Sequence, residues 1–440
     1  MKTRNASRIF SIVLTLIAVT FGLAVRAQAQ YPVIYNFAGN WSGGVPESSL
    51  VMDGAGNLYG TTVLGGGKPN TCTQIYEDCG VVFEMSPSSG GTWNYSVLHA
   101  FTGDANGGSP FKSLVQDAAG NLYGTTIDGG DNSHCSGGQY YSVGCGIVFE
   151  LSKNSSGHWK ETVLYTFEGG TDGANPFSDL LIDAAGNLYG TTQFGGSPTG
   201  CTNDGCGVAY RLSHTSTGWH YAVLYAFPGQ SQRTQYPEDL VQDASGNLYG
   251  TTFNGGNPAC GCGTVFRLSP TASGPWTATV LYEFAGGTDG SNPGYGLSLD
   301  STGNLYGVTE LGGASSFGTV FEISPGSGDS WTETQLYSFA GGSDAQYPRT
   351  GPIFDTAGNL YGSSIFGGGD TFDCIPNGCG VAYELSPSSG GWSESVLYGF
   401  QADLGYYPNG IIRDAAVNLY GTTSSGGPAG VGIAFRIITE

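Results

Sequence analysis

Three acidic residues have the spacing of a catalytic group. Asp179 and Asp239 stand just before an expected strand in two neighbouring units of a repeated sequence, and Glu238 precedes the second. If the two strands are adjacent, these side chains meet near the centre of the fold. Two carboxyl groups about 5–10 Å apart are the arrangement that hydrolyses glycosidic bonds. The alternative, which we favour, is that they are solvated loop acids.

A second set of residues suits sugar binding. Trp41 lies in the segment Gly-Asn-Trp-Ser-Gly, and four tyrosines occupy comparable segments of other units. Exposed aromatic rings among small polar residues suit the faces of sugar rings. The alternative is that the rings pack on their own loops. The four tyrosines are Tyr236, Tyr347, Tyr406 and Tyr407.

Aspartates recur before glycine in the segments that join the units. Asp172 and Asp289 lie in Gly-Gly-Thr-Asp-Gly, and Asp104 and Asp344 are related to them. Ca²⁺ prefers several oxygen ligands, so these residues are candidate calcium ligands. Asp-Gly also forms tight turns, and we favour this interpretation. We expect no metal and no cofactor.

All ten cysteines occur in pairs inside variable segments. Within a pair, one to nine residues separate the two cysteines, whereas zinc sites need consistent ligand spacing. An even number of cysteines in an exported chain indicates disulfides within each loop. A Cys260–Cys262 bridge would be strained, because it spans one residue. The expected pairs are Cys72/Cys79, Cys135/Cys145, Cys201/Cys206, Cys260/Cys262 and Cys374/Cys379.

These residues are positioned by a repeat. Asp-x-x-Gly-Asn predicts a tight turn, in which the Asp side chain accepts backbone N–H groups. Leu-Tyr-Gly-Thr-Thr after it predicts a strand. We therefore interpret the seven turn aspartates as turn residues rather than as a metal or catalytic ring. The core Asn-Leu-Tyr-Gly begins at Asn57, Asn121, Asn187, Asn247, Asn304, Asn359 and Asn418.

Each unit reads as four strands, and the two ends of the chain complete one another. The last unit ends after its third strand, near Ile438, and residues 31–38 match a fourth strand. The sequence therefore predicts an all-β, seven-bladed β-propeller with four-stranded blades, closed when the N-terminal strand joins the C-terminal blade. The expected domains are a signal peptide at 1–29 and a propeller at 30–440, with blades at about 46–101, 110–167, 176–227, 237–284, 293–339, 348–400, and 408–438 plus 31–38.

This topology predicts two different faces. The Asp-x-x-Gly-Asn turns lie on one, which we call the turn face. The variable segments between second and third strands, and those between blades, lie on the other, which we call the loop face. Long loops on a rigid scaffold are where binding residues usually occur. Tryptophans that open the fourth strands are expected between blades: Trp93, Trp159, Trp219, Trp276, Trp331 and Trp392.

Charge and the N-terminus restrict location and partners. Acidic residues outnumber basic ones 35 to 14, which excludes nucleic acid and anionic membranes as partners. Lys2, Arg4 and Arg8 precede an apolar run at 9–25, and Ala-Gln-Ala ends at residue 29. This pattern predicts a cleaved signal peptide, with an uncleaved anchor helix as the alternative. We expect a secreted monomer, extracellular or periplasmic, with no membrane span after cleavage.

The repeated segments also resemble a known family. Val-Leu-Tyr-x-Phe, Asp-x-Ala-Gly-Asn-Leu-Tyr-Gly-Thr-Thr and Gly-x-Val-Phe-Glu-Leu-Ser-Pro resemble the GloVer tandem repeat of secreted bacterial proteins. The resemblance implies an exported bacterial propeller and brings no established activity and no catalytic residues. Members typically carry a surface-anchoring tail after the repeats, and we expect none here.

Three functions are compatible with these features. The first, which we favour, is a non-catalytic propeller that binds a glycan or an extracellular protein through Trp41 and the loop tyrosines. The second is a polysaccharide-acting enzyme that uses Asp179, Glu238 or Asp239. The third is a purely structural surface protein. The first requires the aromatic residues, and the second requires the carboxylates.

The cysteine pairs give a direct test. Mass spectrometry of unreduced peptides should find each loop closed by its own bridge, which stabilises the fold by about 2–3 kcal/mol per loop. Free thiols at Cys72, Cys135, Cys201 or Cys374, or bridges between blades, would contradict this.

Overall fold

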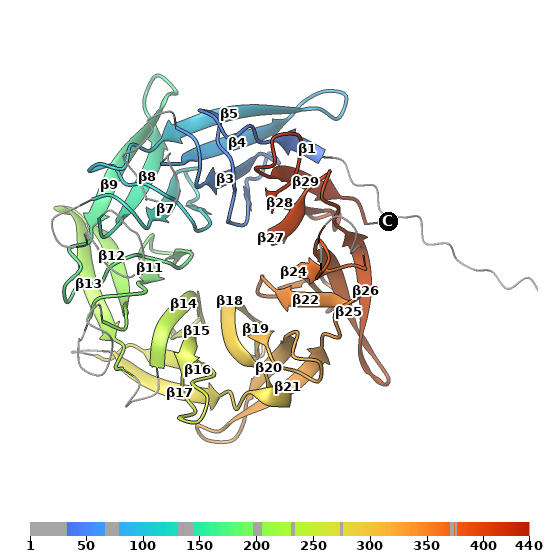
Figure 1. The fold of residues 1–440 in the computed structure, drawn as a ribbon. Helices are drawn as coiled ribbons and strands as arrows, with labels where there is room; N and C mark the ends of the chain where they lie inside the picture. Colours follow the sequence, from blue (N-terminus) through green and yellow to red (C-terminus); the bar gives the residue numbers. More distant parts are fainter. Residues whose placement is uncertain are drawn as a thin grey trace, which may run out of the picture.

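Seven antiparallel sheets stand as blades around a central axis (Figure 1). The computed structural model describes residues 33–66, 79–130, 135, 144–196, 205–229, 234–272, 276–369, 374 and 376–439. In six blades the strands follow one another in chain order from the centre outwards, and in the seventh the first strand of the chain is the outermost. The predicted seven-bladed propeller is confirmed. The predicted signal peptide lies outside the described residues.

The innermost strands are short in most blades, and the outer strands are longer. The blades are, in order, β2 (Val51–Met52), β3 (Leu58–Thr62), β4 (Val81–Pro87), β5 (Trp93–Ala100); β6 (Val115–Gln116), β7 (Leu122–Thr126), β8 (Ile147–Lys153), β9 (Trp159–Thr166); β10 (Leu181–Ile182), β11 (Leu188–Thr191), β12 (Val208–Thr215), β13 (Gly218–Ala226); β14 (Thr234–Gln242), β15 (Leu248–Gly255), β16 (Thr264–Ser269), β17 (Thr277–Glu283); β18 (Ser291–Leu299), β19 (Leu305–Leu311), β20 (Thr319–Pro325), β21 (Trp331–Ser338); β22 (Ala345–Pro348), β23 (Ile353–Phe354), β24 (Leu360–Gly367), β25 (Val381–Ser388), β26 (Gly391–Gly399); and β27 (Tyr406–Arg413), β28 (Leu419–Ser425), β29 (Ile433–Ile437) with β1 (Val33–Asn36).

The two ends of the chain close the ring as predicted. β1 pairs antiparallel with β29, and Val33 lies opposite Phe435. The same blade also contacts the first blade, because the Thr422 hydroxyl donates to the Ser48 carbonyl at 3.1 Å. The seventh blade is therefore built from both ends of the chain, and the ring has no open sheet edge between its first and last units.

The turn aspartates hold their own turns. In the first blade, Oδ1 of Asp53 accepts the N–H groups of Ala55 and Asn57, both at 2.9 Å. Oδ2 accepts Asn57 Nδ2 at 2.8 Å and the Tyr59 hydroxyl at 3.1 Å. The prediction of turn chemistry is confirmed for all seven. The equivalent residues are Asp117, Asp183, Asp243, Asp300, Asp355 and Asp414.

The rest of the repeated strand is explained by packing. A Cβ on Gly60 would lie 2.6 Å from the Phe83 ring, so the glycine leaves room for the third strand's aromatic side chain. The hydroxyl of Thr61 donates to the Lys112 carbonyl of the next blade at 3.2 Å. The hydroxyl of Thr62 donates to the Leu64 carbonyl at 2.7 Å. The first threonine therefore joins two blades, and the second fixes the start of the loop.

Tryptophans lie between blades, as predicted. The Trp159 ring contacts the Tyr59 ring of the preceding blade edge to face, with centroids 6.4 Å apart. Trp93 makes the same contact with Tyr420 across the closure of the ring, at 6.2 Å. Trp219 and Trp331 also contact a tyrosine of the preceding blade. Trp276 and Trp392 pack against clusters that contain the equivalent tyrosine.

A glycine and a proline meet at every boundary between blades. A Cβ on Gly80 would lie 2.7 Å from the ring of Pro110 in the next blade, so no larger residue fits. Gly432 faces Pro46 in the same way, at 3.0 Å, where the ring closes. The other five pairs are Gly146 with Pro176, Gly207 with Pro237, Gly263 with Pro293, Gly318 with Pro348, and Gly380 with Pro408.

One turn departs from the repeat and generates a prediction. Val417 has φ 67°, where the six equivalent glycines have φ between 80° and 92°. A β-branched residue is unfavourable in this left-handed region, so Val417→Gly should raise the free energy of unfolding by about 1 kcal/mol. Urea denaturation would measure it.

The matched control is Gly358→Val. A Cβ at Gly358 meets nothing within 4 Å, so its cost is that of the backbone alone. It should lower the free energy of unfolding by a similar amount. A destabilised Val417→Gly variant would contradict this account.

Candidate binding site at the central mouth

The loop face is held together where each blade begins. The residue before each blade's repeated proline has a positive φ, between 51° and 58°. In the third blade this residue is Asn175, whose N–H donates to the Cys145 carbonyl at 2.9 Å. This backbone turn directs the residues after the proline toward the centre of the ring. We call the surface formed by these segments the central mouth.

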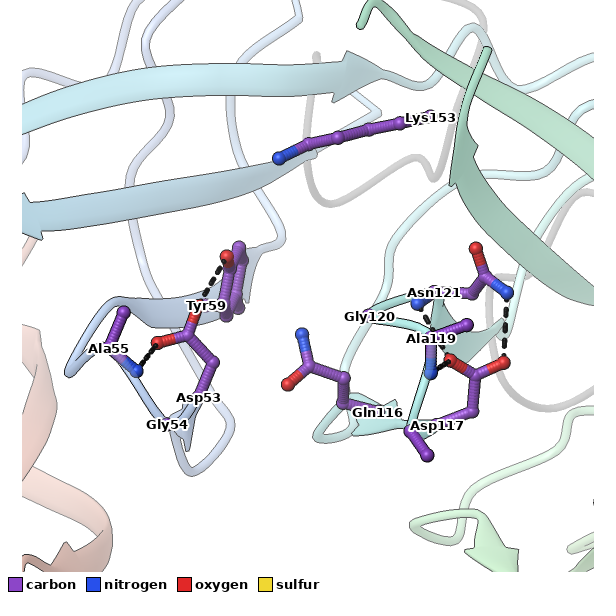
Figure 2. A pocket seen from close by; sticks show the side chains of 11 residues that line it. Asp53, Gly54, Ala55, Tyr59, Gln116, Asp117, Ala119, Gly120, Asn121 and Lys153 are labelled. Atoms are coloured by element: carbon purple, nitrogen blue, oxygen red, sulfur yellow. Dashed lines mark hydrogen bonds between the residues drawn. The ribbon is translucent and has the colours of Figure 1, made fainter. Parts of the chain in front are cut away.

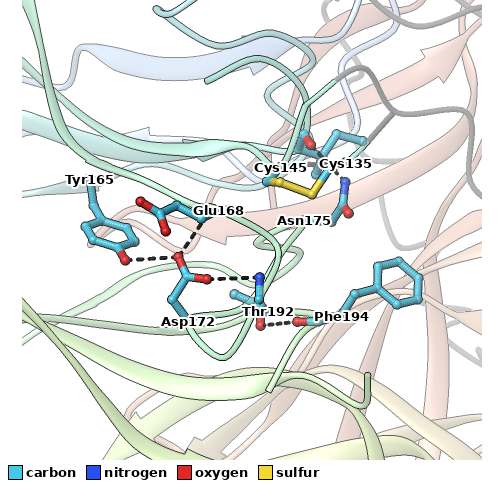
Figure 3. The surroundings of a disulfide bond; sticks show 10 residues. Cys135, Cys145, Tyr165, Glu168, Asp172, Asn175, Thr192 and Phe194 are labelled. Carbon is cyan, nitrogen blue, oxygen red and sulfur yellow. Dashed lines mark hydrogen bonds between the residues drawn. A yellow bond between two sulfur atoms is a disulfide. The ribbon is translucent and has the colours of Figure 1, made fainter. Parts of the chain in front are cut away.

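The disulfides lie beside this turn. Cys135–Cys145, shown in Figure 3 next to Asn175, is one of the described bridges. Cys260–Cys262 and Cys374–Cys379 are the others, each with 5.2 Å between Cα atoms.

Two further cysteines take part in bridges whose other halves are not described. Cys79 and Cys206 are disulfide-bonded, and their predicted partners Cys72 and Cys201 lie outside the described residues. Within the described part of the chain no cysteine is free. The carbonyl of Cys79 accepts the Ser109 N–H at 2.8 Å, so this cysteine is also fixed at the boundary between blades.

The candidate calcium ligands belong to turns. Asp172 accepts the Tyr165 hydroxyl at 3.0 Å and the Glu168 N–H at 2.9 Å, as Figure 3 shows. Asp289 and Asp344 accept a tyrosine hydroxyl and a backbone N–H in the same way. At Asp104 the carbonyl accepts N–H groups of the loop instead. The described residues contain no group of three or more side chains that would hold a metal ion.

The predicted carboxylates come together at the central mouth. Asp179 Oδ1 accepts the Ser113 N–H at 2.7 Å, and the Asp179 N–H donates to Asp239 Oδ1 at 2.6 Å. Ser49 N–H donates to Ser113 Oγ at 3.1 Å in the same row. Side chains at this position therefore tie four successive blades together, and Asp179 and Asp239 have a structural role.

Lys112 lies among these acids. Its Nζ is 3.7 Å from Glu238 Oε2, 3.7 Å from Asp239 Oδ1 and 4.8 Å from the centroid of the Phe177 ring. Burial disfavours its charged form, but the charges of Asp239, Glu238 and Asp179 together raise the pKa of the lysine. The lysine stays protonated and offsets the negative charge of the mouth.

Among the three acids around Lys112, Glu238 and Asp179 have raised pKa values. Burial raises the pKa of the Glu238 carboxyl to about 8, although the charge of Lys112 opposes this. Burial, and then the charge of Asp239, raise the pKa of Asp179 to about 6, again against Lys112. Glu238 is therefore largely neutral near pH 7, and it can both donate and accept a hydrogen bond.

A small cavity with aromatic walls opens beside Glu238. Its volume is about 190 Å³. We call it the aromatic cavity, and its polar side chains include the Glu238 carboxyl and the Gln193 amide. The four rings that line it are Phe177, Tyr236, Phe253 and Tyr295.

A second cavity lies at the mouth near the closure of the ring. Its volume is about 380 Å³. We call it the arginine cavity, because Arg349 is its basic residue. The side chain of Arg349 also stacks on Tyr295, 5.4 Å from the ring centroid. Its other main wall residues are Glu47, Ile365, Tyr407, Asn409 and Ser424.

Two of the five aromatic residues that we expected to bind a ligand line one of these cavities. Tyr236 lines the aromatic cavity and Tyr407 the arginine cavity. Tyr347 packs between Phe317 and Phe366, with centroids 6.1 and 5.7 Å away.

Like Tyr347, two further predicted aromatic residues line neither cavity. Tyr406 packs against Tyr407 at 4.6 Å. Trp41 is 68% exposed and lies in the segment that leads to the first blade. We did not identify Glu47, Arg349 or three of the four rings around Glu238 from the sequence. Most of them directly follow a repeated proline, and this position in the repeat was the signal that could have identified them.

The turn face is also hollowed, between the first two blades. Figure 2 shows the turns of Asp53 and Asp117 side by side, with Lys153 opposite them. The volume is about 410 Å³. The carboxylate of Asp117 already accepts the N–H groups of its own turn. The walls are therefore mainly backbone and turn atoms.

Comparison with known proteins agrees with the repeat. A model of the Gloeobacter/Verrucomicrobia repeat matches residues 19–202, 135–374 and 197–435. The chain belongs to this family. The resemblance to the GloVer repeat is thereby confirmed. No curated protein matches the chain.

Several solved structures are similar to this chain at low sequence identity. PorZ, a surface component of the type-IX secretion system of Porphyromonas gingivalis, is 13% identical with a TM-score of 0.51; the match covers 89% of this chain and 46% of that one. A gluconolactonase of Xanthomonas campestris is 14% identical with a TM-score of 0.38, over 67% and 79% of the two chains. A Dyadobacter fermentans protein of unknown function is 10% identical with a TM-score of 0.47, over 94% and 99%. These likenesses concern the fold alone.

Over the described ranges, no helix has the length and apolar character needed to cross a membrane.

The ionisation of Glu238 gives a prediction. Its folded-state pKa of about 8 exceeds that of an unfolded glutamate, so the folded state binds a proton that the unfolded state releases. This contribution to stability is present at low pH and is lost as pH rises through about 8. The glutamine in Glu238→Gln cannot ionise. The free energy of unfolding of this variant should therefore fall by roughly 1–3 kcal/mol less than that of the wild type between about pH 5 and pH 8.5.

Urea denaturation of wild type and variant at both pH values would measure the difference. The comparison isolates Glu238, because other buried acids such as Glu394, whose pKa burial raises to about 8, remain in both proteins. Parallel profiles for the two proteins would contradict the assignment.

Proposed function

We propose that this chain is an exported binding propeller whose central mouth holds a saccharide. The observation that carries the proposal is the aromatic cavity. Four rings surround one carboxyl and one amide in a volume of about 190 Å³, which suits a single sugar ring. The disulfides fit the oxidising compartment that an exported chain enters.

Both kinds of contact that a sugar needs are available. Its C–H faces pack on aromatic rings such as Tyr236 and Phe253, and this burial favours binding. Its hydroxyl groups pair with the Gln193 amide and the Glu238 carboxyl, each of which donates and accepts. The walls stand on the inner ends of strands and beside prolines, so little order is lost on binding.

A second candidate is a polysaccharide-acting enzyme, and one observation favours it. Glu238 lines the cavity with its pKa raised to about 8, as a general acid requires. Its partner would be Asp179 or Asp239. Both of these accept a backbone N–H of the preceding blade, which leaves them less free to act on a substrate.

A glycan array with the folded protein tests the proposal. Wild type should retain a neutral glycan, and Tyr236→Ala should weaken binding at least tenfold, about 1.4 kcal/mol. Tyr347→Ala is the matched control. Tyr347 also precedes a repeated proline and has a similar φ of 57°, against 54° for Tyr236, but it packs between two phenylalanines.

Three results would contradict the proposal. One is the absence of glycan binding by a folded protein. Another is an equal loss of glycan affinity in Tyr236→Ala and Tyr347→Ala. The third is a polysaccharide-degrading activity, measured as the release of sugar ends, that the wild type has and Glu238→Gln lacks. That result would favour the second candidate, the enzyme, over the binding protein.

A further inference from the structure

The aromatic cavity and the arginine cavity are built from the same repeat positions. The residue before the repeated proline is Tyr236 in one and Tyr407 in the other. The residue after that same proline is Glu238 in one and Asn409 in the other. The fourth blade supplies the first pair, and the seventh blade supplies the second. Glu47, which follows the proline of the first blade, has the position of Gly294 in the aromatic cavity. Repeat symmetry therefore places a tyrosine and a hydrogen-bonding side chain alike in both cavities.

A cation–π contact joins a residue of one cavity to a residue of the other. Tyr295 lines the aromatic cavity, Arg349 lines the arginine cavity, and the guanidinium of Arg349 lies over the Tyr295 ring at 5.4 Å. A long ligand that occupies one cavity therefore crosses this stack to reach the other. The stack offers a flat surface of the kind that sugar rings also pack against.

Arg349 retains hydrogen-bonding capacity toward the arginine cavity. Its Nη1 is 3.9 Å from Glu47 Oε2, which is too far for a hydrogen bond. Its Nε is buried, out of a ligand's reach, whereas the side chain as a whole is 35% exposed. The Asn409 amide nitrogen already donates to the Pro46 carbonyl and to Thr422 Oγ1. The Ser424 hydroxyl donates to the Tyr407 carbonyl. The terminal nitrogens of Arg349 are therefore the donors that ligand hydroxyl groups would reach.

Charge favours a neutral ligand. Each cavity has one glutamate, and burial raises the pKa of Glu47 as it raises that of Glu238. The whole chain carries a formal net charge of −21, which repels polyanions. A neutral chain of sugars avoids this repulsion, and its hydroxyl groups pair with both the carboxyls and the guanidinium.

We propose that the two cavities are subsites of one binding site, which holds two separated residues of a single neutral glycan chain across the Tyr295–Arg349 stack. This inference rests on the proposed function. A ligand long enough to fill both subsites gains affinity because its second contact is intramolecular. A monosaccharide fills each subsite independently.

Isothermal titration calorimetry with sugars of defined length tests this. The probes are oligomers of one to six residues from cellulose, β-1,3-glucan, xylan and mannan, with polygalacturonate oligomers as the anionic comparison. For at least one neutral series, the monosaccharide should bind weakly at two sites per chain. Beyond a threshold length, one oligomer should bind per chain, at least about tenfold more tightly.

Two variants separate the subsites. Tyr236→Ala and Tyr407→Ala should each return the long oligomer to roughly the affinity of the monosaccharide, at one site. Ser424→Tyr replaces a small wall residue by a large one and so fills the arginine cavity while Tyr407 stays in place, and it should act as Tyr407→Ala does. Tyr347→Ala should bind as wild type, and thermal melting of each variant shows that the ring is folded.

The outcomes are distinguishable. Two long oligomers per chain with the affinity of the monosaccharide would overturn the two-subsite inference and leave the proposed function standing. Tighter binding of polygalacturonate would overturn the neutral ligand. No binding by any neutral oligomer would overturn both proposals.

Discussion

The contact on which the structure depends is the meeting of a glycine in one blade with a proline in the next. A Cβ at Gly146 would lie 2.7 Å from Pro176 and 2.2 Å from the Thr126 carbonyl, so the boundary closes only around glycine. The proline is preceded by a residue with positive φ, Asn175 in this case, whose N–H donates to the neighbouring blade. A proline limits its own φ and restricts the residue before it. Both restrictions therefore act at the point where each inner strand turns toward the axis.

This boundary also creates the central mouth. The residue after each proline lies at the inner end of its blade, and its identity differs from blade to blade: Glu47, Phe111, Phe177, Glu238, Gly294, Arg349 and Asn409. The backbone turn at this proline recurs in all seven blades. The blades therefore differ at the central mouth in the chemistry of their side chains. Lys112, buried with its Nζ 3.7 Å from Asp239 Oδ1, shows that this chemistry includes charges that water no longer solvates. Such charges are costly to bury unless they are paired, as they are here.

The sequence predicts the ring well and the site only in part. The Asp turn, the closing strand near Ile433 and the tryptophans between blades follow from residue types that recur at a fixed period. The meeting of Asp179 with Asp239 also follows, because equivalent positions of adjacent blades must be neighbours. Cavity walls such as Phe253 and Tyr295 do not follow, because they occupy positions where the repeat varies and about 40 residues separate them along the chain. Only the curvature of the ring brings such residues to one cavity.

The central claim is that the loop face at the central mouth, and not the turn face, is where ligand binds. Hydrogen–deuterium exchange measured by mass spectrometry, with and without a saturating neutral oligosaccharide, tests this without any substitution. The account predicts slower exchange in peptides that cover residues 45–49, 236–239, 293–296 and 407–410, and unchanged exchange in the turns at 53–57 and 117–121. Slower exchange confined to those two turns, beside the hollow that Lys153 faces, would contradict it.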